Sequence, residues 1–455
     1  MLTELSVTNF KSWQRIKQMR LGPITGLFGP NSSGKTSVLQ LLLMLKQTVE
    51  SPDRAQALML GSEKSPADLG SFSDVVFGHG ERLSWRLAWE YGEPFAVTDP
   101  DDVLKELFSC RRMAFEAEVS EGRMQRPVVD RMTYELQDKR GGIRFALRRR
   151  GKSESKYELD TEGLAFRFQR NRGRPADLPR PVKCYGFPDQ VRTRYQNAGF
   201  LADLELAFEE LLGRVYYLGP LRDYPRRQYQ WAGAEPADMG QRGEHVVHAL
   251  LAARERDLRI WPGPFKKKVL LEEYEAQWLQ KLGLVETFTV ERISRDSNLY
   301  RVRVRKSANS SDVLITDVGF GVSQILPVLV LCYYVPEGST VLLEQPEIHL
   351  HPSVQAGLAD VFIDAVERRG VQIIFESHSE HLLRRLQRRM AEEKITPEST
   401  ALYFCEMRNG ESRLRSLELD PYGRIANWPE GFFGDEFGEM AATTTAAMKR
   451  IAEGR

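Results

Sequence analysis

The sequence predicts an α/β protein with a mixed or parallel core sheet, an antiparallel β subdomain and a helical insertion. Near the N-terminus, an apolar strand at 24–30 runs through a Gly/Ser loop into an apolar helix at 37–49. Short alternating segments between about 82 and 170, separated by Gly or charged turns, predict antiparallel strands. In the C-terminal half strands and helices alternate, an order typical of a parallel sheet covered by helices: strand 340–344, helix 353–368, strand 371–376, helix 379–390 and strand 400–406.

The remaining elements follow from the same patterns. Residues 2–8 and 215–222 are expected to form strands, and 189–213 to be helical. Three further strands, 285–293, 299–306 and 311–318, precede a helix that contains Pro327. We therefore expect five segments: 1–80 (N-terminal core with the Gly/Ser loop), 81–175 (antiparallel β), 176–284 (helical insertion with the 215–222 strand), 285–418 (C-terminal core) and 419–455 (tail).

Composition limits the function classes. The 455 residues suggest two or three domains, and 28% charged with 42% hydrophobic residues is ordinary for a globular protein. A net charge of +1 gives no global attraction to nucleic acid or membrane. There is no apolar run of membrane-spanning length, and MLTELSVTNFKSW lacks the features of a secretory signal. Four widely spaced cysteines predict reduced thiols, no zinc cluster and a cytoplasmic location.

The segment GPNSSGKT (29–36) matches G-x-x-x-x-G-K-[ST] in full. Glycines in this pattern let the backbone curl around phosphates, and the loop amides meet the anion at a helix N-terminus. Lys35 is expected to reach the β- and γ-phosphates, and Thr36 to ligate Mg²⁺. The predicted ATP-binding residues are Gly29, Asn31, Ser32, Ser33, Gly34, Lys35, Thr36 and Ser37.

The segment VLLEQPEIHLHP (341–352) predicts the second half of this site. Glu344 ends a strand and is expected to hold Mg²⁺ together with Thr36. The next residue, where a second acid would orient the attacking water, is Gln345, whose amide can orient water but cannot accept its proton. Either turnover is slow, or Glu347 acts as the base. The alternative is that Glu347 caps the next helix or holds an arginine across a dimer.

Two other segments are candidates for the same chemistry. His378 follows a neighbouring strand and could sense the γ-phosphate, although a lone histidine is more often structural. Residues 317–327 are expected to form a Gly/Ser loop before a helix. This loop could bring Gly321, Val322, Ser323 and Gln324 to a nucleotide held by another subunit. A metal site formed by His349, His351, His381 and Glu347 is the weaker interpretation, because HLHP is more easily a turn and a helix start.

These segments together resemble the ABC-type ATPase heads of the SMC/RecF/OLD group. The resemblance covers about residues 1–50 and 310–410 and rests on LSVTNFKSW, GPNSSGKTS, DVGFGVSQ, VLLEQPEIHLHP and IIFESHSEHLL. Three more segments resemble a branch of stand-alone bacterial AAA-labelled ATPases that often lie in anti-phage defence loci, with Septu-type and PARIS-type relatives: DLGSFSDVVFGH (68–79), YYLGPLRDYPRRQY (216–229) and NWPEGFFGDEF (427–437).

The resemblance implies that ATP and Mg²⁺ are held between two heads, with residues 31–36 of one facing Gly321, Val322 and Ser323 of the other. It implies a homodimer or higher homo-oligomer, and a slow ATPase whose ATP-dependent dimerisation controls an effector protein encoded nearby. No acid-rich toprim-like segment follows the core, so nuclease chemistry would belong to a partner.

Two alternatives stay open. One is a RecF-like DNA-binding repair ATPase, whose basic runs would follow phosphates: Arg148, Arg149, Arg150 and Lys152, and Arg384, Arg385, Arg388 and Arg389. Such runs are more often solvated faces. The other alternative is a scaffold that binds ATP with little turnover, which Gln345 favours.

Overall fold

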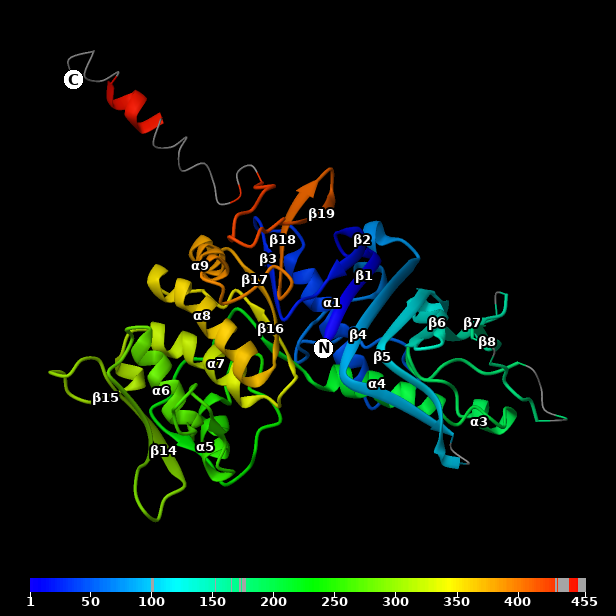
Figure 1. Ribbon diagram of the computed structural model, residues 1–455, viewed down its shortest axis with the longest axis horizontal. Coiled ribbons are helices and arrows are strands. Elements are labelled where there is room, and N and C mark those ends of the chain that lie inside the picture. The colour runs from blue at the N-terminus through cyan, green and yellow to red at the C-terminus, as the bar shows by residue number, and fades with distance from the viewer. Residues whose placement is uncertain are drawn as a thin grey trace.

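A six-stranded core sheet lies at the centre of the molecule (Figure 1). A seven-stranded antiparallel sheet lies at one end, and helices α5 and α6 with a small antiparallel sheet lie at the other. The computed structural model describes residues 1–99, 102–151, 153–164, 166–171, 173, 177–429, 432 and 442–448.

The core sheet has the strand order β19-β18-β3-β17-β16-β9, and only β19 runs antiparallel to its neighbour. Its apolar strands are buried on both faces, as parallel sheets usually are. The strands are β3 (Ile24–Phe28), β9 (Val215–Leu218), β16 (Thr340–Glu344), β17 (Gln372–Ser377), β18 (Thr400–Arg408) and β19 (Glu411–Ser416). The parallel core expected from the C-terminal alternation is confirmed.

The helices of this alternation begin where local chemistry favours it. Helix α8 (Pro352–Arg369) has His351 as its N-cap and proline at its first position. Helix α9 (Glu380–Ala391) begins after Ser379, whose side chain accepts a hydrogen bond from the amide of Leu382. With α1 (Lys35–Glu50) and α7 (Gly321–Tyr334), they provide the apolar cover of the sheet.

Each face of the core sheet packs into its own hydrophobic core. Leu342 and Ile374 belong to the core that contains α1 and the seven-stranded sheet. Their neighbours Leu343 and Ile373 belong to the core that contains α7, α8 and α9. This alternation of side chains along each strand fixes the register of the sheet between its two layers.

The seven-stranded sheet contains strands from two segments that we expected to be separate, 1–80 and 81–175. Its order is β2-β1-β4-β5-β6-β7-β8, and β1 pairs with β4 from Leu2↔Trp89 to Thr8↔Ser84. The expected boundary between 80 and 81 therefore runs through one sheet. Its strands are β1 (Leu2–Phe10), β2 (Trp13–Arg20), β4 (Arg82–Asp99), β5 (Asp102–Glu121), β6 (Pro127–Asp138), β7 (Gly141–Arg149) and β8 (Tyr157–Gly163).

Some elements differ from expectation. The helical span 189–213 is two helices, α3 (Gln190–Arg194) and α4 (Leu201–Gly213), and the strand expected to reach residue 222 ends at Leu218. Only Val313–Leu314 of 311–318 is a strand, and a 3-10 turn follows. The other elements are α2 (Phe72–Val75), β10 (Tyr229–Gln230), α5 (Val246–Glu255), β11 (Arg259–Ile260), β12 (Val269–Leu270), α6 (Leu271–Lys281), β13 (Thr287–Arg292), β14 (Leu299–Arg305) and β15 (Val313–Leu314), with short 3-10 turns at Phe77–His79, Arg123–Gln125 and Ile315–Asp317.

Among the described residues, no helix combines the length and apolarity that crossing a bilayer requires. In the C-terminal tail expected at 419–455, residues 430–431, 433–441 and 449–455 lie outside the described residues.

Candidate nucleotide site

The candidate site lies where parallel strands of the core sheet end. Strands β3, β17, β16 and β9 are consecutive neighbours and point the same way, so the loops after them leave the sheet at one edge. These loops carry Gly29–Gly34, His378, Gln345–Glu347 and Arg222. Residues far apart in the chain therefore meet at this edge.

The Gly/Ser loop has the backbone that a phosphate cradle needs. Gly29 has φ 139° and Gly34 has φ 92°, both in the region that favours glycine. A Cβ on Gly29 would lie 2.1 Å from the carbonyl oxygen of Cys405, and one on Gly34 would lie 2.4 Å from Ser412 Oγ. Only glycine fits at either position.

The predicted loop residues lie around this cradle. Asn31 and Ser32 are exposed, Thr36 and Ser37 are half-buried, and Ser33 is buried. Lys35 folds back over the loop, with its Nζ donating to the carbonyls of Gly29 (3.0 Å) and Pro30 (2.7 Å). Burial lowers the pKa of Lys35, and the neighbouring Glu376 carboxylate opposes that shift.

Two carboxylates lie side by side at the ends of β16 and β17. Glu344 and Glu376 are direct register partners, and Thr36 Oγ1 donates to Glu376 Oε2 at 2.7 Å. The sequence predicted that Thr36 and Glu344 share a cation, whereas Glu376 was not predicted. The signal was present, because IIFE (373–376) repeats the pattern of VLLE (341–344), in which three apolar residues lead to an acid.

Burial makes this pair of acids costly to ionise. It raises the pKa of Glu344 to about 7, with the nearby Glu376 adding to the shift and a hydrogen bond with Tyr217 opposing it. Burial also raises the pKa of Glu376, which Thr36 and Lys35 oppose. A hydroxyl and two carboxylates are the hard oxygen donors that Mg²⁺ prefers, so Thr36, Glu344 and Glu376 fit a divalent cation.

The predicted histidine cluster has a different role. His351 caps α8, with its Nδ1 accepting from the amide of Ser353 at 3.3 Å. Across the described ranges, no group of three or more His, Cys, Asp or Glu side chains is arranged to hold a metal ion. The expected turn and helix start is what the structure shows.

Gln345 and Glu347 face different partners. Gln345 has φ 43°, its backbone amide donates to the carbonyl of Glu376 at 3.0 Å, and its side chain lies near the Glu376 carboxylate. Glu347 is buried, and its Oε1 accepts from the amide of His378 at 2.7 Å. Its Oε2 has no hydrogen-bond partner among the described residues, and burial raises its pKa. Glu347 thus has one carboxylate oxygen without a hydrogen-bond partner in the described structure, whereas Gln345 lies beside Glu376.

His378 closes the site on the loop side. The residue is exposed, and partial burial of its ring together with the charge of Lys35 lowers its pKa. A neutral imidazole is therefore favoured beside the phosphate loop at neutral pH.

A family sequence pattern matches residues 130–384, which is more than half of the chain. Its description is "AAA domain, putative AbiEii toxin, Type IV TA system". The chain belongs to this AAA-domain family. A second pattern, described as "Protein of unknown function (DUF3696)", matches residues 395–442. The curated proteins contain no match to this chain.

Solved structures of SMC heads are similar at low identity. The "SMC head domain from Thermotoga maritima" is 11% identical, and the match covers 92% of this chain and 99% of that one with a TM-score of 0.42. An SmcHead bound to the C-winged helix domain of ScpA is also 11% identical, covering 92% and 98% of the two chains with a TM-score of 0.46.

In this AAA-domain chain, the residues predicted to contact a second subunit lie at the start of α7. The side chains of Val322, Ser323 and Gln324 are buried, and Ser323 Oγ donates to the carbonyl of Phe320 at 2.9 Å. Gly321 is half-buried, so the backbone at this helix N-terminus lies closer to the surface than those three side chains.

An exposed apolar patch surrounds that helix end. Leu221, Tyr224 and Phe320 are 62%, 72% and 60% exposed, and the rings of Tyr224 and Phe320 lie 6.0 Å apart. We call these three side chains the α7 patch. Clustered exposed apolar groups commonly mark interaction surfaces.

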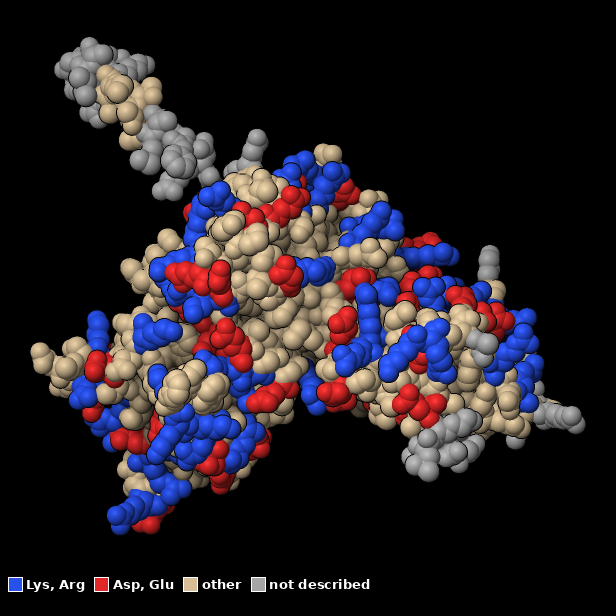
Figure 2. All heavy atoms as spheres, in the orientation of Figure 1, with Lys and Arg blue, Asp and Glu red and all other residues tan. Residues whose placement is uncertain are grey.

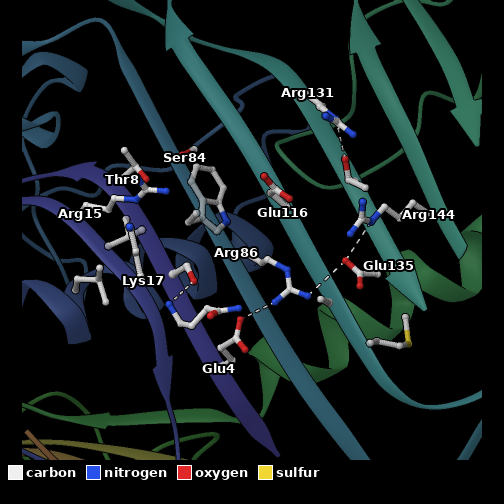
Figure 3. Close-up of a pocket in the computed structure, with 18 of the residues that line it drawn as sticks. Glu4, Thr8, Arg15, Lys17, Ser84, Arg86, Glu116, Arg131, Glu135 and Arg144 are labelled. Atoms are coloured by element: carbon white, nitrogen blue, oxygen red, sulfur yellow. Dashed lines mark hydrogen bonds and ion pairs between the residues drawn. The ribbon is translucent and has the colours of Figure 1, made fainter. Parts of the chain in front are cut away.

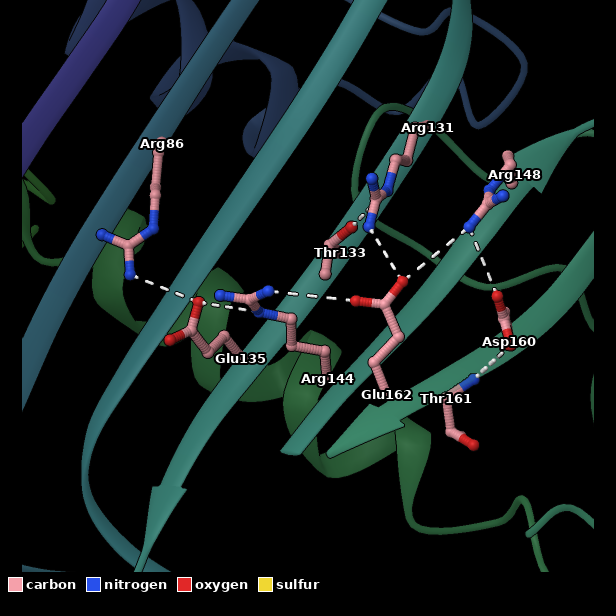
Figure 4. Close-up of polar contacts among 9 residues, drawn as sticks. All are labelled: Arg86, Arg131, Thr133, Glu135, Arg144, Arg148, Asp160, Thr161 and Glu162. Atoms are coloured by element: carbon pink, nitrogen blue, oxygen red, sulfur yellow. Dashed lines mark hydrogen bonds and ion pairs between the residues drawn. The ribbon is translucent and has the colours of Figure 1, made fainter. Parts of the chain in front are cut away.

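The basic runs are neutralised within the chain. Arg148 pairs with Asp160, as Figure 4 shows, and every other arginine of the two runs also has an acidic partner: Arg149–Asp130, Arg150–Asp177, Arg384–Glu380, Arg385–Asp360, Arg388–Glu392 and Arg389–Asp360. Lys152 lies outside the described residues. These runs therefore resemble paired surface networks more than phosphate tracks.

A hollow of about 840 Å³ lies away from the candidate site, on the polar face of the seven-stranded sheet (Figure 3). Arg86 bridges Glu4 and Glu135 across it, and Arg144 also pairs with Glu135. Figure 2 shows basic and acidic side chains interspersed over the visible part of this lobe. Six basic side chains line the hollow, against three acidic ones: Arg15, Lys17, Arg86, Arg112, Arg131 and Arg144, with Glu4, Glu116 and Glu135.

Proposed function

We propose that this chain is a Mg²⁺-dependent ATPase that binds ATP at the carboxyl edge of the core sheet. One observation carries the proposal: the hydroxyl of Thr36, inside a complete phosphate-loop motif, donates to Glu376, the register partner of Glu344. A phosphate cradle and a two-carboxylate cation site thus share one edge.

Each residue has a role that its position supports. Gly29–Lys35 would surround the phosphates, and Lys35 would exchange its carbonyl partners for phosphate oxygens. Thr36, Glu344 and Glu376 would hold Mg²⁺, which would neutralise charge on the phosphates when bound. Tyr217 orients Glu344 through its hydrogen bond.

Glu347 is the proposed base. Its Oε1 is fixed by the amide of His378, while Oε2 is free among the described groups to accept a proton from water. Gln345 is occupied by Glu376 and contributes by holding that carboxylate. This arrangement favours turnover over a scaffold that only binds ATP.

The larger role we propose is an ATP-dependent switch. Two heads would associate through the α7 patch and the N-terminus of α7, with nucleotide between them, and the closed dimer would control a partner effector. The family description names a toxin–antitoxin system, which supports a defence role with a second protein component. The DNA-binding alternative is less favoured, because the described arginines of its basic runs have acidic partners.

Removing Lys35 tests the site. We expect Lys35→Ala to abolish ATP binding in a titration with fluorescent ATP, because it removes the main charge facing the β- and γ-phosphates. Lys64→Ala, at an exposed lysine, is the matched control and should bind normally. Equal affinity of wild type and Lys35→Ala would remove the basis for this function. Salt-dependent binding of a DNA duplex by wild type would instead favour the repair ATPase.

A further inference from the structure

Arg222 is a buried cation without a hydrogen-bond partner. Its side chain is 8% exposed, and none of its three guanidinium nitrogens is hydrogen-bonded within the described part of the chain. A buried charge normally has partners, because water has been removed from it. A guanidinium left this way is therefore a candidate for binding an anion.

Arg222 lies in the loop after strand β9, at the edge of the core sheet that carries the candidate nucleotide site. β9 runs parallel to β16 with Leu218 opposite Leu343, so the loop that begins at Gly219 leaves the sheet beside Glu344. The carboxyl groups that act electrostatically on Arg222 are those of Glu344 and Glu347. Burial lowers the pKa of Arg222 to about 10, and it remains a cation at neutral pH.

The charge balance of the site calls for a second cation. Glu344, Glu347 and Glu376 are buried carboxylates, and in their ionised forms they would repel the outer end of a polyphosphate. Lys35 lies on the β3 side of these acids, whereas Arg222 lies on the β9 side. Arg222 therefore supplies positive charge where Lys35 does not.

Space and geometry match a phosphate group. A pocket of about 470 Å³ is lined by Arg222 together with Tyr224, Phe320, Gln324 and His349. The planar fork of a guanidinium binds two phosphate oxygens at once, which a lysine ammonium cannot do. The three guanidinium nitrogens are themselves buried, so the side chain must turn toward this pocket to meet an anion.

We propose that Arg222 binds the terminal phosphate of the nucleoside triphosphate held by its own chain, and so distinguishes ATP from ADP. The proposal rests on the ATP site proposed above. Because the proposed contact involves only the terminal phosphate, it predicts a difference between ATP and ADP binding, which the ATP site alone does not predict.

The test compares the affinities of fluorescent ATP and ADP in the presence of Mg²⁺. Arg222→Gln should weaken ATP binding by about 10-fold or more and leave ADP binding nearly unchanged, since a charged hydrogen bond is lost only with ATP. Arg222→Lys should fall between wild type and Arg222→Gln. Arg226→Gln, at an exposed arginine of the same loop, is the matched control and should bind both nucleotides as wild type does.

Two outcomes would overturn the inference while leaving the ATP site intact: equal weakening of ATP and ADP, or unchanged ATP binding in Arg222→Gln. If wild type binds neither nucleotide, the proposed function is wrong, and so is the role proposed for Arg222. The same titration in a Gly321→Arg background, which should prevent dimers, shows whether Arg222 contacts the phosphate of its own chain's nucleotide or that of a second subunit. A persisting effect of Arg222→Gln supports the chain's own nucleotide, and a lost effect overturns that assignment.

Thermal unfolding without nucleotide gives a second readout. A charge buried without partners destabilises the apo protein, so Arg222→Gln should unfold at the same temperature as wild type or higher. A fall of several degrees would show that Arg222 is a structural partner of Glu344 and Glu347, and would count against phosphate binding.

Discussion

The side chain of Gln345 lies near the carboxylate of Glu376, while Oε2 of Glu347 has no hydrogen-bond partner in the described structure. A carboxylate in place of Gln345 would add a further negative charge beside Glu376 and Glu344, whose pKa values burial already raises. In the proposed ATPase, the amide would neighbour Glu376 without adding charge, and Glu347 would act as the base.

Glu347→Gln and Gln345→Glu separate these roles. Glu347→Gln should slow phosphate release by roughly 100-fold or more while ATP still binds, because the proton acceptor is lost. Gln345→Glu should not exceed the wild-type rate, because its new carboxylate repels Glu376. Phosphate release under excess Mg²⁺ and ATP measures both. A nearly inert wild type that Gln345→Glu accelerates would make Gln345 a brake and would remove Glu347 from catalysis.

The sequence predicted this site unevenly for a physical reason. The phosphate loop, Glu344 and Glu347 lie in short contiguous motifs, so local pattern was sufficient. Glu376, Tyr217 and Arg222 contribute only because β17 lies between β3 and β16 and because β9 is the next strand beyond β16. Strand order is a long-range property, and no local spacing in the sequence encodes it.

At the scale of the element, the buried carboxyl groups at the ends of β16 and β17 make the stability of the fold depend on pH. Glu344 has a pKa of about 7 in the folded chain, above its ordinary value of 4.5. Between these values the native state binds more protons than the unfolded state, so the contribution of Glu344 to stability is lost as pH rises from about 4.5 through 7. Binding a cation at these strand ends should restore it.

The predicted pH dependence can be measured with Glu344→Gln. Relative to wild type, this variant should become more stable as pH rises from 5 to 8, by up to about 3 kcal/mol, because an amide does not ionise. In wild type, excess Mg²⁺ should stabilise more at pH 8 than at pH 6, since the cation competes with protons. Urea unfolding at each pH measures both. A variant whose stability runs parallel to wild type across this range would contradict the shifted pKa.

Element patterns explain what the sequence predicted of the fold. The alternation of strands and helices from β16 to β18 was confirmed. It could be predicted because the apolar residues of each strand and helix follow the spacing that is typical of that element. The strand expected to reach residue 222 stops at Leu218, where Gly219 and Pro220 follow and proline cannot donate to a ladder. The pairing of β1 with β4 was missed, since it joins residues about 80 positions apart.

At the scale of the whole molecule, the α7 patch is apolar and exposed in a single chain. Its residues come from the loop after β9 and from the start of α7, and all three line the same pocket as Arg222. A second copy would cover these side chains and bring its own phosphate loop to the helix N-terminus. ATP would then be part of the contact, which makes association depend on the nucleotide.

Gly321→Arg tests this association without removing a buried group. A Cβ at Gly321 meets only Leu284 Cδ2, at 3.4 Å, so the monomer should accept the substitution. The arginine should project where a second head would approach. We expect ATP and Mg²⁺ to shift wild type to a dimer or larger assembly in sedimentation velocity, and to leave Gly321→Arg monomeric with ATP still bound. Leu206→Arg, on an exposed position of α4, is the matched control and should associate as wild type does. The same nucleotide-induced assembly in Gly321→Arg would show that the heads do not meet at α7.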